Sequence, residues 1–227
     1  MRVRHPCLSA FLKKENTSII DSKIHSLFVT PVYITELKRK FTNEENKFTD
    51  EIKLKCHKNI GNITSDDNYI INNKQYSSLR KELNEIVKDY FNKIICPSDD
   101  IKPYITQSWL NFTETDQHHH IHNHPNSLVS GILYINADKH NDKVKFYASA
   151  PSNRYSMIDI GTEKFNQFNS KSWWFSIETG QIFLFPSYLT HSVEIKQGEN
   201  TRISLAFNVF IKGMVGSKRE LTELILT

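Results

Sequence analysis

Hydrophobic positions repeat at two different spacings along the chain. Between residues 43 and 94 they recur every three or four positions, which is typical of helices that bury one face. From about residue 105 almost to the end they recur every second position, as in strands with one buried face. The pattern therefore predicts helices first and a mainly β region after them.

The first part is predicted to contain a strand and two helices. Residues 27–35 are rich in β-branched and aromatic residues and predict an edge strand interrupted by a proline. Residues 42–45 have the pattern of a capping box, so a short amphipathic helix is expected over 43–57. Residues 77–94 form the clearest helix, and the polar stretch 61–73 is expected to be a loop.

The second part is predicted to contain short strands separated by polar residues, glycine or proline. They span residues 105–112, 128–135, 143–148, 173–177, 181–185, 192–195 and 202–210. Strands of this length and spacing predict a sandwich, a barrel or a jelly roll. The long polar insertion at 151–171 is expected to be a lid or a disordered loop.

Length and composition indicate one structural domain. With 227 residues the chain can bury one core, with residues 1–26 as an N-terminal extension, 27–104 packing on the core and 105–227 forming it. The chain is 38% hydrophobic and 24% charged, and no apolar run is long enough to cross a bilayer, which argues against a membrane protein. The net charge of +4 is modest and not gathered in a block, so nucleic-acid binding is not supported.

The cysteines and the N-terminus predict a cytoplasmic location. The three cysteines are widely spaced and form no Cys-x-x-Cys pair, which argues against a disulfide framework or a thiolate zinc site. The first residues are positively charged but have no apolar core of signal-peptide length. A reducing compartment is therefore expected.

A histidine cluster is the strongest chemical signal in the sequence. Five of the ten histidines lie between His118 and His124, next to a predicted strand. Histidine is a common metal ligand, so the cluster predicts a metal site. On a regular strand His118, His120, His122 and His124 would share one side and His119 would point to the other. The alternative is a solvated histidine loop that binds metal only adventitiously.

Two later segments bring further candidate residues. A predicted strand ends at Phe185-Pro-Ser and leads to His191. In the last long strand, alternation places Arg202 and Ser204 on the face opposite the apolar residues. A buried arginine is costly without an anion, and no acidic residue in the neighbouring motifs is an obvious partner. We therefore expect Arg202 to bind the carboxylate of a ligand.

Taken in order, these motifs carry a family resemblance. They are His122-x-His124-Pro-x-Ser-x-x-Ser130-Gly-x-x-Tyr134, Phe185-Pro-Ser, His191-x-Val193 and Arg202-x-Ser204-x-x-Phe207-Asn208. The sequence resembles the iron(II)- and 2-oxoglutarate-dependent oxygenases, and most of all a small branch found in bacteria and phages. The resemblance extends from about residue 27 to the end of the chain.

The resemblance implies a mainly β fold, the double-stranded β-helix or jelly roll, with supporting N-terminal helices. It places His122 and His191 as iron ligands and puts His124 where the family usually has an aspartate or glutamate. Three imidazoles could hold iron, but they are also a familiar zinc set. His119 or His120 could replace either ligand of the His-x-His pair, and Asp116 could supply a carboxylate from the strand end.

The resemblance also implies a cosubstrate site. Arg202 would bind the far carboxylate of 2-oxoglutarate, with Ser204 beside it and Tyr134 as a further hydrogen-bond donor. Residues that could contact the substrate or support the metal ligands are Asn111, Trp109, His119, His120 and Asn208.

The implied function is a dioxygenase that uses iron(II), 2-oxoglutarate and dioxygen. It would release succinate and CO2 while hydroxylating an unidentified substrate, either a protein residue such as proline or a small metabolite. A phage-encoded protein would act in the host cytoplasm. Two alternatives stay open: a cupin-like zinc or manganese hydrolase or isomerase, and a non-catalytic β-sandwich binding module.

Overall fold

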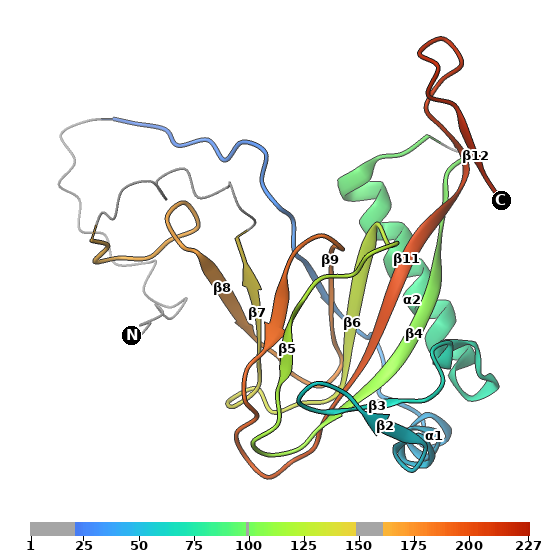
Figure 1. Ribbon diagram of the computed structural model, residues 1–227, viewed down its shortest axis with the longest axis vertical. Coiled ribbons are helices and arrows are strands. Elements are labelled where there is room, and N and C mark those ends of the chain that lie inside the picture. Colours follow the sequence, from blue (N-terminus) through green and yellow to red (C-terminus); the bar gives the residue numbers. More distant parts are fainter. Residues whose placement is uncertain (1–20, 99, 149–160) are drawn as a thin grey trace.

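The computed structural model describes residues 21–98, 100–148 and 161–227. Within them the chain forms two antiparallel sheets, with the helices beside the larger one (Figure 1). This is the jelly-roll class that the sequence predicts. Most of the N-terminal extension and part of the 151–171 insertion lie outside the described residues.

The larger sheet has the strand order β1-β9-β6-β11-β4-β3-β2, and β12 pairs with β11. Its strands are β1 (Tyr33–Glu36), β2 (Cys56–Lys58), β3 (Ile63–Ser65), β4 (Lys102–Thr113), β6 (Val129–Asn136), β9 (Gln181–Pro186), β11 (Arg202–Val215) and β12 (Leu224–Leu226). The smaller sheet has the order β5-β10-β7-β8. Its strands are β5 (His119–His122), β7 (Lys143–Tyr147), β8 (Ser172–Ser176) and β10 (His191–Val193).

Two α-helices precede the long strands: α1 (Asn43–Lys53) and α2 (Ser77–Tyr90). The predicted capping box of α1 is present, because the Thr42 side chain accepts from the Glu45 amide and the Glu45 side chain accepts from the Thr42 amide. Two 3-10 turns, Ile70–Asn72 and Lys74–Tyr76, lead into α2, and a π-helical turn, Phe91–Ile95, ends it. No helix in the described part of the chain is long and apolar enough to span a membrane.

Four local predictions differ from the structure. The first helix stops at Lys53 because the next residues form β2, which pairs with β3 as a hairpin at the sheet edge. The same hairpin and a 3-10 turn occupy much of the predicted loop 61–73. The lead-in strand starts only at Tyr33, after the proline, where it pairs with β9. Beyond the predicted end of the last strand, β11 continues to Val215 and forms a projecting hairpin with β12 (Figure 1).

The two faces of the larger sheet have different environments. One face packs against the helices, with Leu110, Leu133, Leu205 and Phe207 among the buried residues of that core. The other face contributes Ile132, Tyr134, Phe183 and Phe185 to a second core, which also includes Val144 and Phe146 of the smaller sheet. Because β11 alternates between these environments, Arg202 and Ser204 face the smaller sheet, on which the histidines lie.

Candidate metal centre and carboxylate pocket

Three of the predicted ligands converge on one point at the edge of the smaller sheet. His122 and His191 are register partners on the adjacent strands β5 and β10. His124 follows β5, and its backbone amide donates to the carbonyl oxygen of Ser187 at 3.0 Å. One nitrogen from each of these three side chains lies within 4.8 Å of the other two. The chain thus brings together histidines that are up to 69 residues apart, 191 minus 122.

Two of these imidazoles are fixed in the tautomer that suits metal binding. The Nδ1 atom of His122 lies 2.8 Å from the carbonyl oxygen of His120, and that of His191 lies 3.1 Å from the carbonyl oxygen of Leu189. A carbonyl oxygen only accepts, so both Nδ1 atoms carry the proton and donate. Each Nε2 atom therefore keeps a lone pair free for a ligand bond, as in metal-binding histidines.

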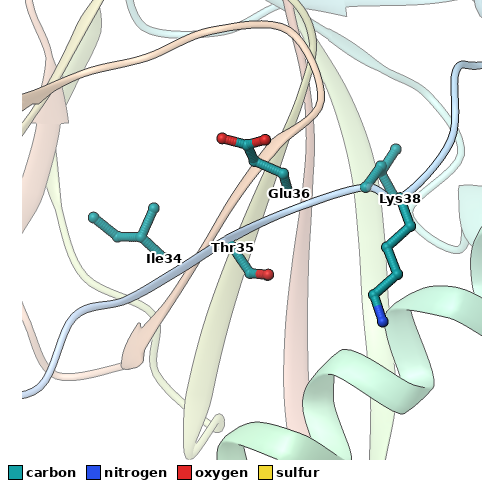
Figure 2. Close-up of a pocket in the computed structure, with 5 residues that line it drawn as sticks. Ile34, Thr35, Glu36 and Lys38 are labelled. Carbon is teal, nitrogen blue, oxygen red and sulfur yellow. The ribbon is translucent and has the colours of Figure 1, made fainter.

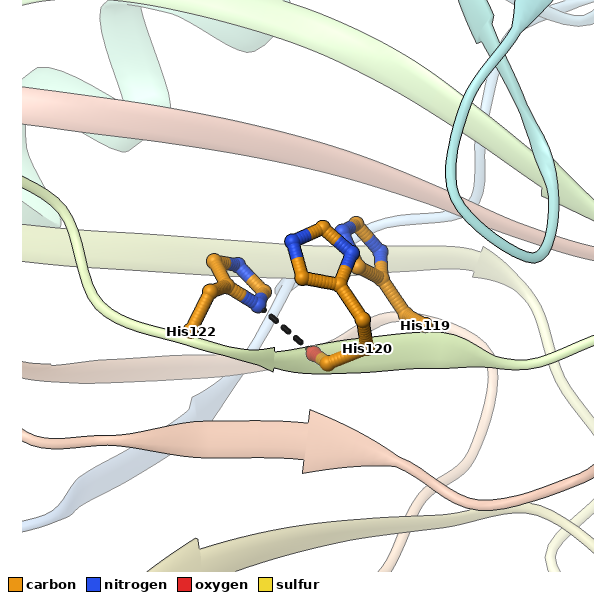
Figure 3. A group of neighbouring side chains, drawn as sticks. All are labelled: His119, His120 and His122. Carbon is orange, nitrogen blue, oxygen red and sulfur yellow. Dashed lines mark hydrogen bonds between the residues drawn. The ribbon is translucent and has the colours of Figure 1, made fainter.

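The strand β5 contains a bulge that changes the expected direction of His119. His191 pairs with His122 and Val193 pairs with His119, so one extra residue of β5 is accommodated between these pairs. His119, His120 and His122 therefore lie on the same side of the strand (Figure 3). The prediction that His119 points to the opposite side was wrong, since its ring stacks on that of His122 with centroids 4.6 Å apart.

The bulge creates a second histidine group that overlaps the first. His119, His120 and His122 also have ligand nitrogens within 4.8 Å of one another. Because Nδ1 of His122 donates to a carbonyl, only its Nε2 atom is free. His122 can therefore complete either group, but not both at once.

Burial favours the neutral form of four of these histidines. It lowers the pKa of His124 to about 4 and that of His119 to about 3, and in both cases the charge on His122 adds to the effect. Burial also lowers the pKa of His122, and the pKa of His191 lies well below its usual range. At neutral pH the rings are therefore in the form that binds metal ions.

Arg202 is buried as predicted, but it already has an acidic partner. Its Nη1 atom donates to Oδ1 of Asp142 at 3.1 Å, and both side chains are almost fully buried. The expectation that only a ligand carboxylate would pair with Arg202 was wrong, because Asp142 lies in the turn between β6 and β7, outside the matched motifs. The other terminal guanidinium nitrogen, Nη2, is buried and has no hydrogen-bond partner.

Tyr134 presents a second unpartnered donor near Arg202. It is 1% exposed, and its hydroxyl is buried without a hydrogen-bond partner. Burial raises its pKa above the usual range, while the charge of Arg202 lowers it, so the hydroxyl stays protonated and can donate. Ser204 pairs in register with both Tyr134 and Asn111, which places these three residues on one face of the larger sheet. A buried surface with unsatisfied donors is suited to an anion.

The remaining candidates occupy different positions around the site. The ring of Trp109 lies 5.7 Å from that of His124, and Oδ1 of Asn111 is buried without a partner. Asn208 accepts a hydrogen bond from Ser130 at 3.3 Å, which indicates a role in joining β11 to β6. Asp116 is exposed and belongs to neither histidine group found in the described residues.

Three residues near the site were not singled out from the sequence. Asp142 and Lys196 are fully buried, and Asp142 contacts both Lys196 and Arg202. Asn62 from the β2–β3 turn contacts Nδ1 of His119 at 3.4 Å. They lie in polar connections between strands, where periodicity carries no signal. Only the fold brings them to the histidines and the arginine.

A separate hollow lies beside β1 (Figure 2). It is lined by five consecutive residues, Ile34 to Lys38, and includes no histidine. One strand segment supplies all of these residues and they bring no convergent catalytic groups, so we place the functional site at the histidines.

The comparisons with known proteins agree with the fold and the motifs. The sequence pattern of the family described as "Putative 2OG-Fe(II) oxygenase" matches residues 107–208. This range includes the three convergent histidines, Tyr134 and Arg202. No curated protein matches the sequence.

Solved structures share the fold at low sequence identity. A 2OG-Fe(II) oxygenase family protein from Burkholderia pseudomallei is 11% identical, with 78% of this chain and 83% of that chain covered and a TM-score of 0.51. HygX from Streptomyces hygroscopicus, solved with nickel, 2-oxoglutarate and hygromycin B, is 10% identical, with coverages of 79% and 82% and a TM-score of 0.53. SnoN, a non-heme alpha-ketoglutarate-dependent epimerase from nogalamycin biosynthesis, is 8% identical, with coverages of 80% and 78% and a TM-score of 0.54.

The family match covers the strands that carry the site, and the folds of these structures agree with the jelly roll of this chain. Residues 107–208 are therefore similar to the 2OG-Fe(II) oxygenase family, and the chain shares the fold of these structures.

Proposed function

We propose that this chain is a 2-oxoglutarate-dependent oxygenase in which His122, His124 and His191 bind iron(II). The observation that carries the proposal is the convergence of three neutral imidazoles, two of which have Nδ1 bound to a backbone carbonyl and Nε2 free. This donor set fits a divalent transition metal. No carboxylate joins the group among the described residues, so the site has one negative charge fewer than a two-histidine, one-carboxylate site.

The second part of the proposal concerns the cosubstrate. The unpartnered Nη2 atom of Arg202 and the unpartnered hydroxyl of Tyr134 would donate to the distal carboxylate of 2-oxoglutarate, with Ser204 on the same face. HygX, which shares the fold, binds 2-oxoglutarate together with a metal. When both are bound, iron(II) and 2-oxoglutarate would supply the oxidising power for hydroxylation by dioxygen, with succinate and CO2 as products.

The residues of the chain would position the reactants and exclude water. The two Nδ1 hydrogen bonds fix the ring orientations of His122 and His191, so the metal would meet a preformed site. Phe146 and Phe185 pack against the ring of His191, which is 2% exposed, and shield that side of the metal from solvent. Trp109, whose ring lies beside that of His124, would contact a substrate bound at the metal.

The buried donors favour this proposal over a cupin-like zinc or manganese hydrolase or isomerase. Such an enzyme would use the same histidines and would need no arginine. It would leave the buried Nη2 of Arg202 and the hydroxyl of Tyr134 without a purpose, although unsatisfied buried donors are costly. A carboxylate ligand would satisfy both.

The test combines metal analysis with a product assay on protein purified without a histidine tag. His122→Ala and His191→Ala should each abolish stoichiometric iron(II) binding and leave the β-sheet circular dichroism unchanged. His57→Ala is the matched control, because His57 is exposed and pairs with Asp66 away from the site. The wild-type protein should release succinate from 2-oxoglutarate in the presence of iron(II) and dioxygen.

A second variant tests the third ligand. His124→Asp would restore the two-histidine, one-carboxylate set common in non-haem iron oxygenases, so it should still bind iron(II). Loss of iron from this variant would show that another residue, such as His120, completes the site. Full iron occupancy in His122→Ala or His191→Ala would contradict the ligand assignment altogether.

We also propose that the protein acts in the cytoplasm. Cys56 and Cys96, the two cysteines that the structure describes, are free, which fits a reducing compartment. Subcellular fractionation of the native host should recover the protein with cytoplasmic markers.

A further inference from the structure

Most buried charges in the described part of the chain lie at or next to Arg202, whose Nη2 atom forms the proposed carboxylate pocket together with the Tyr134 hydroxyl. Among the described residues, four Asp, Glu, Lys or Arg residues are buried: Glu45, Asp142, Lys196 and Arg202. Glu45 forms an ion pair with Arg39 beside helix α1. Of the other three, Asp142 contacts both Lys196 and Arg202, so this part of the core contains two cations and one anion.

Hydrogen bonds fix the Asp142 carboxylate in a position where it pairs with Nη1 of Arg202. Its Oδ2 atom accepts from the Asp138 amide at 2.8 Å, and its Oδ1 atom accepts from Nη1 of Arg202. The backbone of Asp142 is fixed as well, because its amide donates to Asp138 and its carbonyl accepts from Ile177. A carboxylate fixed in this way restricts rotation of the guanidinium and leaves Nη2 as the unpartnered nitrogen.

Lys196 adds a positive charge that no dedicated acid balances. It is fully buried, and its Nζ atom donates to the neutral oxygens of Gln197 and Asn200 at 2.6 and 2.8 Å. The nearest buried carboxylate is that of Asp142 at 3.6 Å, which already pairs with Arg202. Glu114 and Asp138 also interact with Lys196, but both are partly exposed, so water screens their charges more than it screens that of Asp142.

The three buried residues therefore carry a net charge of +1, from two cations and one anion. An excess charge in a core is unfavourable unless an anion balances it. A bound monovalent carboxylate at Nη2 of Arg202 and the hydroxyl of Tyr134 would bring the buried set to neutrality.

We propose that Asp142 and Lys196 set the selectivity of this pocket for 2-oxo acids with a second carboxylate. Asp142 is a positioning residue that directs Nη2 of Arg202 into the pocket, and Lys196 supplies the charge that the distal carboxylate neutralises. This inference rests on the proposed function, since it assumes that the pocket takes 2-oxoglutarate. It assigns roles to two residues that lie behind the ligand and do not touch it.

The experiment compares two ligands that differ only at the far end. Calorimetry on the anaerobic iron(II)-loaded full-length protein would measure binding of 2-oxoglutarate and of 2-oxopentanoate, which has a methyl group in place of the distal carboxylate. Lys196→Gln keeps an amide donor for Gln197 and Asn200 but removes the charge. It should weaken 2-oxoglutarate binding about tenfold or more, because the lost charge acts at low dielectric, and leave 2-oxopentanoate binding unchanged.

The matched control is Lys145→Gln, which makes the same chemical change on the outer side of β7, where Lys145 pairs with Glu194 at 3.4 Å. It should bind both ligands as the wild type does. If Lys196 only stabilises its loop, Lys196→Gln will weaken both ligands equally, and the proposal fails. Unchanged binding of both ligands would also overturn it.

A double variant separates the effect of Lys196→Gln on the buried charge from its effect on packing. Asp142→Asn combined with Lys196→Gln returns the buried set to +1, so it should bind 2-oxoglutarate more tightly than Lys196→Gln alone. Binding no tighter than that of the single variant would contradict the charge balance. If the wild type does not bind 2-oxoglutarate, the proposed function itself fails, whereas wild-type binding with no change in selectivity refutes only this inference.

Discussion

At the scale of single residues, the unsatisfied donors are the most informative feature of the site. A buried hydroxyl without a partner costs free energy in the ligand-free protein. Tyr134 has such a hydroxyl, and its ring is otherwise well packed, with an edge contact to Phe183 at 6.0 Å between centroids. The fold therefore keeps a group that the unliganded state does not need, which indicates a ligand contact.

The Tyr134→Phe variant distinguishes a hydroxyl that binds the ligand from one that stabilises the fold. The variant removes only the hydroxyl, so the unfolding free energy of the metal-free protein should stay within about 1 kcal/mol of the wild type or rise. The dissociation constant for 2-oxoglutarate should rise roughly tenfold, since one hydrogen bond to a carboxylate is lost. Urea unfolding and anaerobic calorimetry measure the two quantities. A destabilisation of about 2 kcal/mol or more would show that the hydroxyl serves the fold instead.

The sequence predicts single residues well where one strand determines their direction. Alternation along one strand was enough to place Arg202 on the inner face. It gave no indication of Asp142, because that partner is 60 residues away in a polar turn and meets Arg202 only after the sheets close. Long-range pairs of this kind depend on the topology, which a single sequence pattern does not contain.

At the scale of elements, the capping box of α1 also takes part in a partly buried ion pair, between Glu45 and Arg39. Glu45 is almost fully buried and accepts from both terminal nitrogens of Arg39 at 2.8 and 2.7 Å, as well as from the Thr42 amide. Burial alone raises the pKa of Glu45, but the Arg39 and Thr42 hydrogen bonds outweigh it and lower the pKa overall. The ionised form is therefore stabilised in the folded state.

The lowered pKa of Glu45 determines how the stability of the folded protein depends on pH. Below the usual pKa of a glutamate, the unfolded state binds a proton more readily than the folded state, so this stabilisation is present above about pH 4.5 and is lost as the pH falls through the folded pKa. Glu45→Gln should cost about 2 kcal/mol at pH 7. Urea unfolding at pH 7 and pH 3 should show the difference from the wild type shrinking at low pH, and an undiminished difference would contradict the ionic role.

Gly131, in the Ser-Gly part of the family motif, has a structural role. A Cβ atom at this position would lie 2.1 Å from the Phe207 ring, which packs against it from the neighbouring strand. Gly131→Ala must displace that ring from the core and should destabilise the protein by about 1–3 kcal/mol. Thermal unfolding checks this, with Gly161→Ala as the control, because nothing lies within 4 Å of a Cβ there. Equal stability of the two variants would disprove the close packing.

Elements with a long, regular period were predictable, and short or irregular ones were not. The apolar face of α2 is determined by its own spacing and packs as expected. The bulge of β5 depends on its pairing with β10, so the sequence could not show that His119 joins the other histidines. The β2–β3 hairpin consists of three-residue strands, which are too short to show a period.

At the scale of the whole molecule, the site joins the two sheets. The proposed metal ligands His122 and His191 lie on the smaller sheet, and Tyr134 and Arg202 lie on the larger one. The second core fills the space between the sheets. The strand spacing predicted a sandwich, a barrel or a jelly roll, and the family motifs implied the jelly roll, but neither assigned these residues to one sheet or the other. The sequence could not predict contacts such as that between Arg202 and Asp142, because Asp142 lies in a polar turn.

Ligands that engage both sheets should stabilise the molecule as a unit. A ligand that binds only the folded state at 100 times its dissociation constant contributes about 2.7 kcal/mol. For a chain of this size that corresponds to a rise of about 5–10 °C in the unfolding midpoint. Anaerobic iron(II) alone should raise the midpoint. 2-Oxoglutarate alone should raise it little, because Arg202 and Tyr134 would hold only its distal end.

Iron(II) and 2-oxoglutarate together should therefore raise the midpoint by more than the sum of the two separate effects. Differential scanning calorimetry under anaerobic conditions measures this, and a chelator should return the midpoint to that of the metal-free protein. His191→Ala should abolish the metal-dependent part, whereas His57→Ala should retain it. Simple additivity would show that the metal and the cosubstrate bind independently, and it would contradict a shared site between the two sheets.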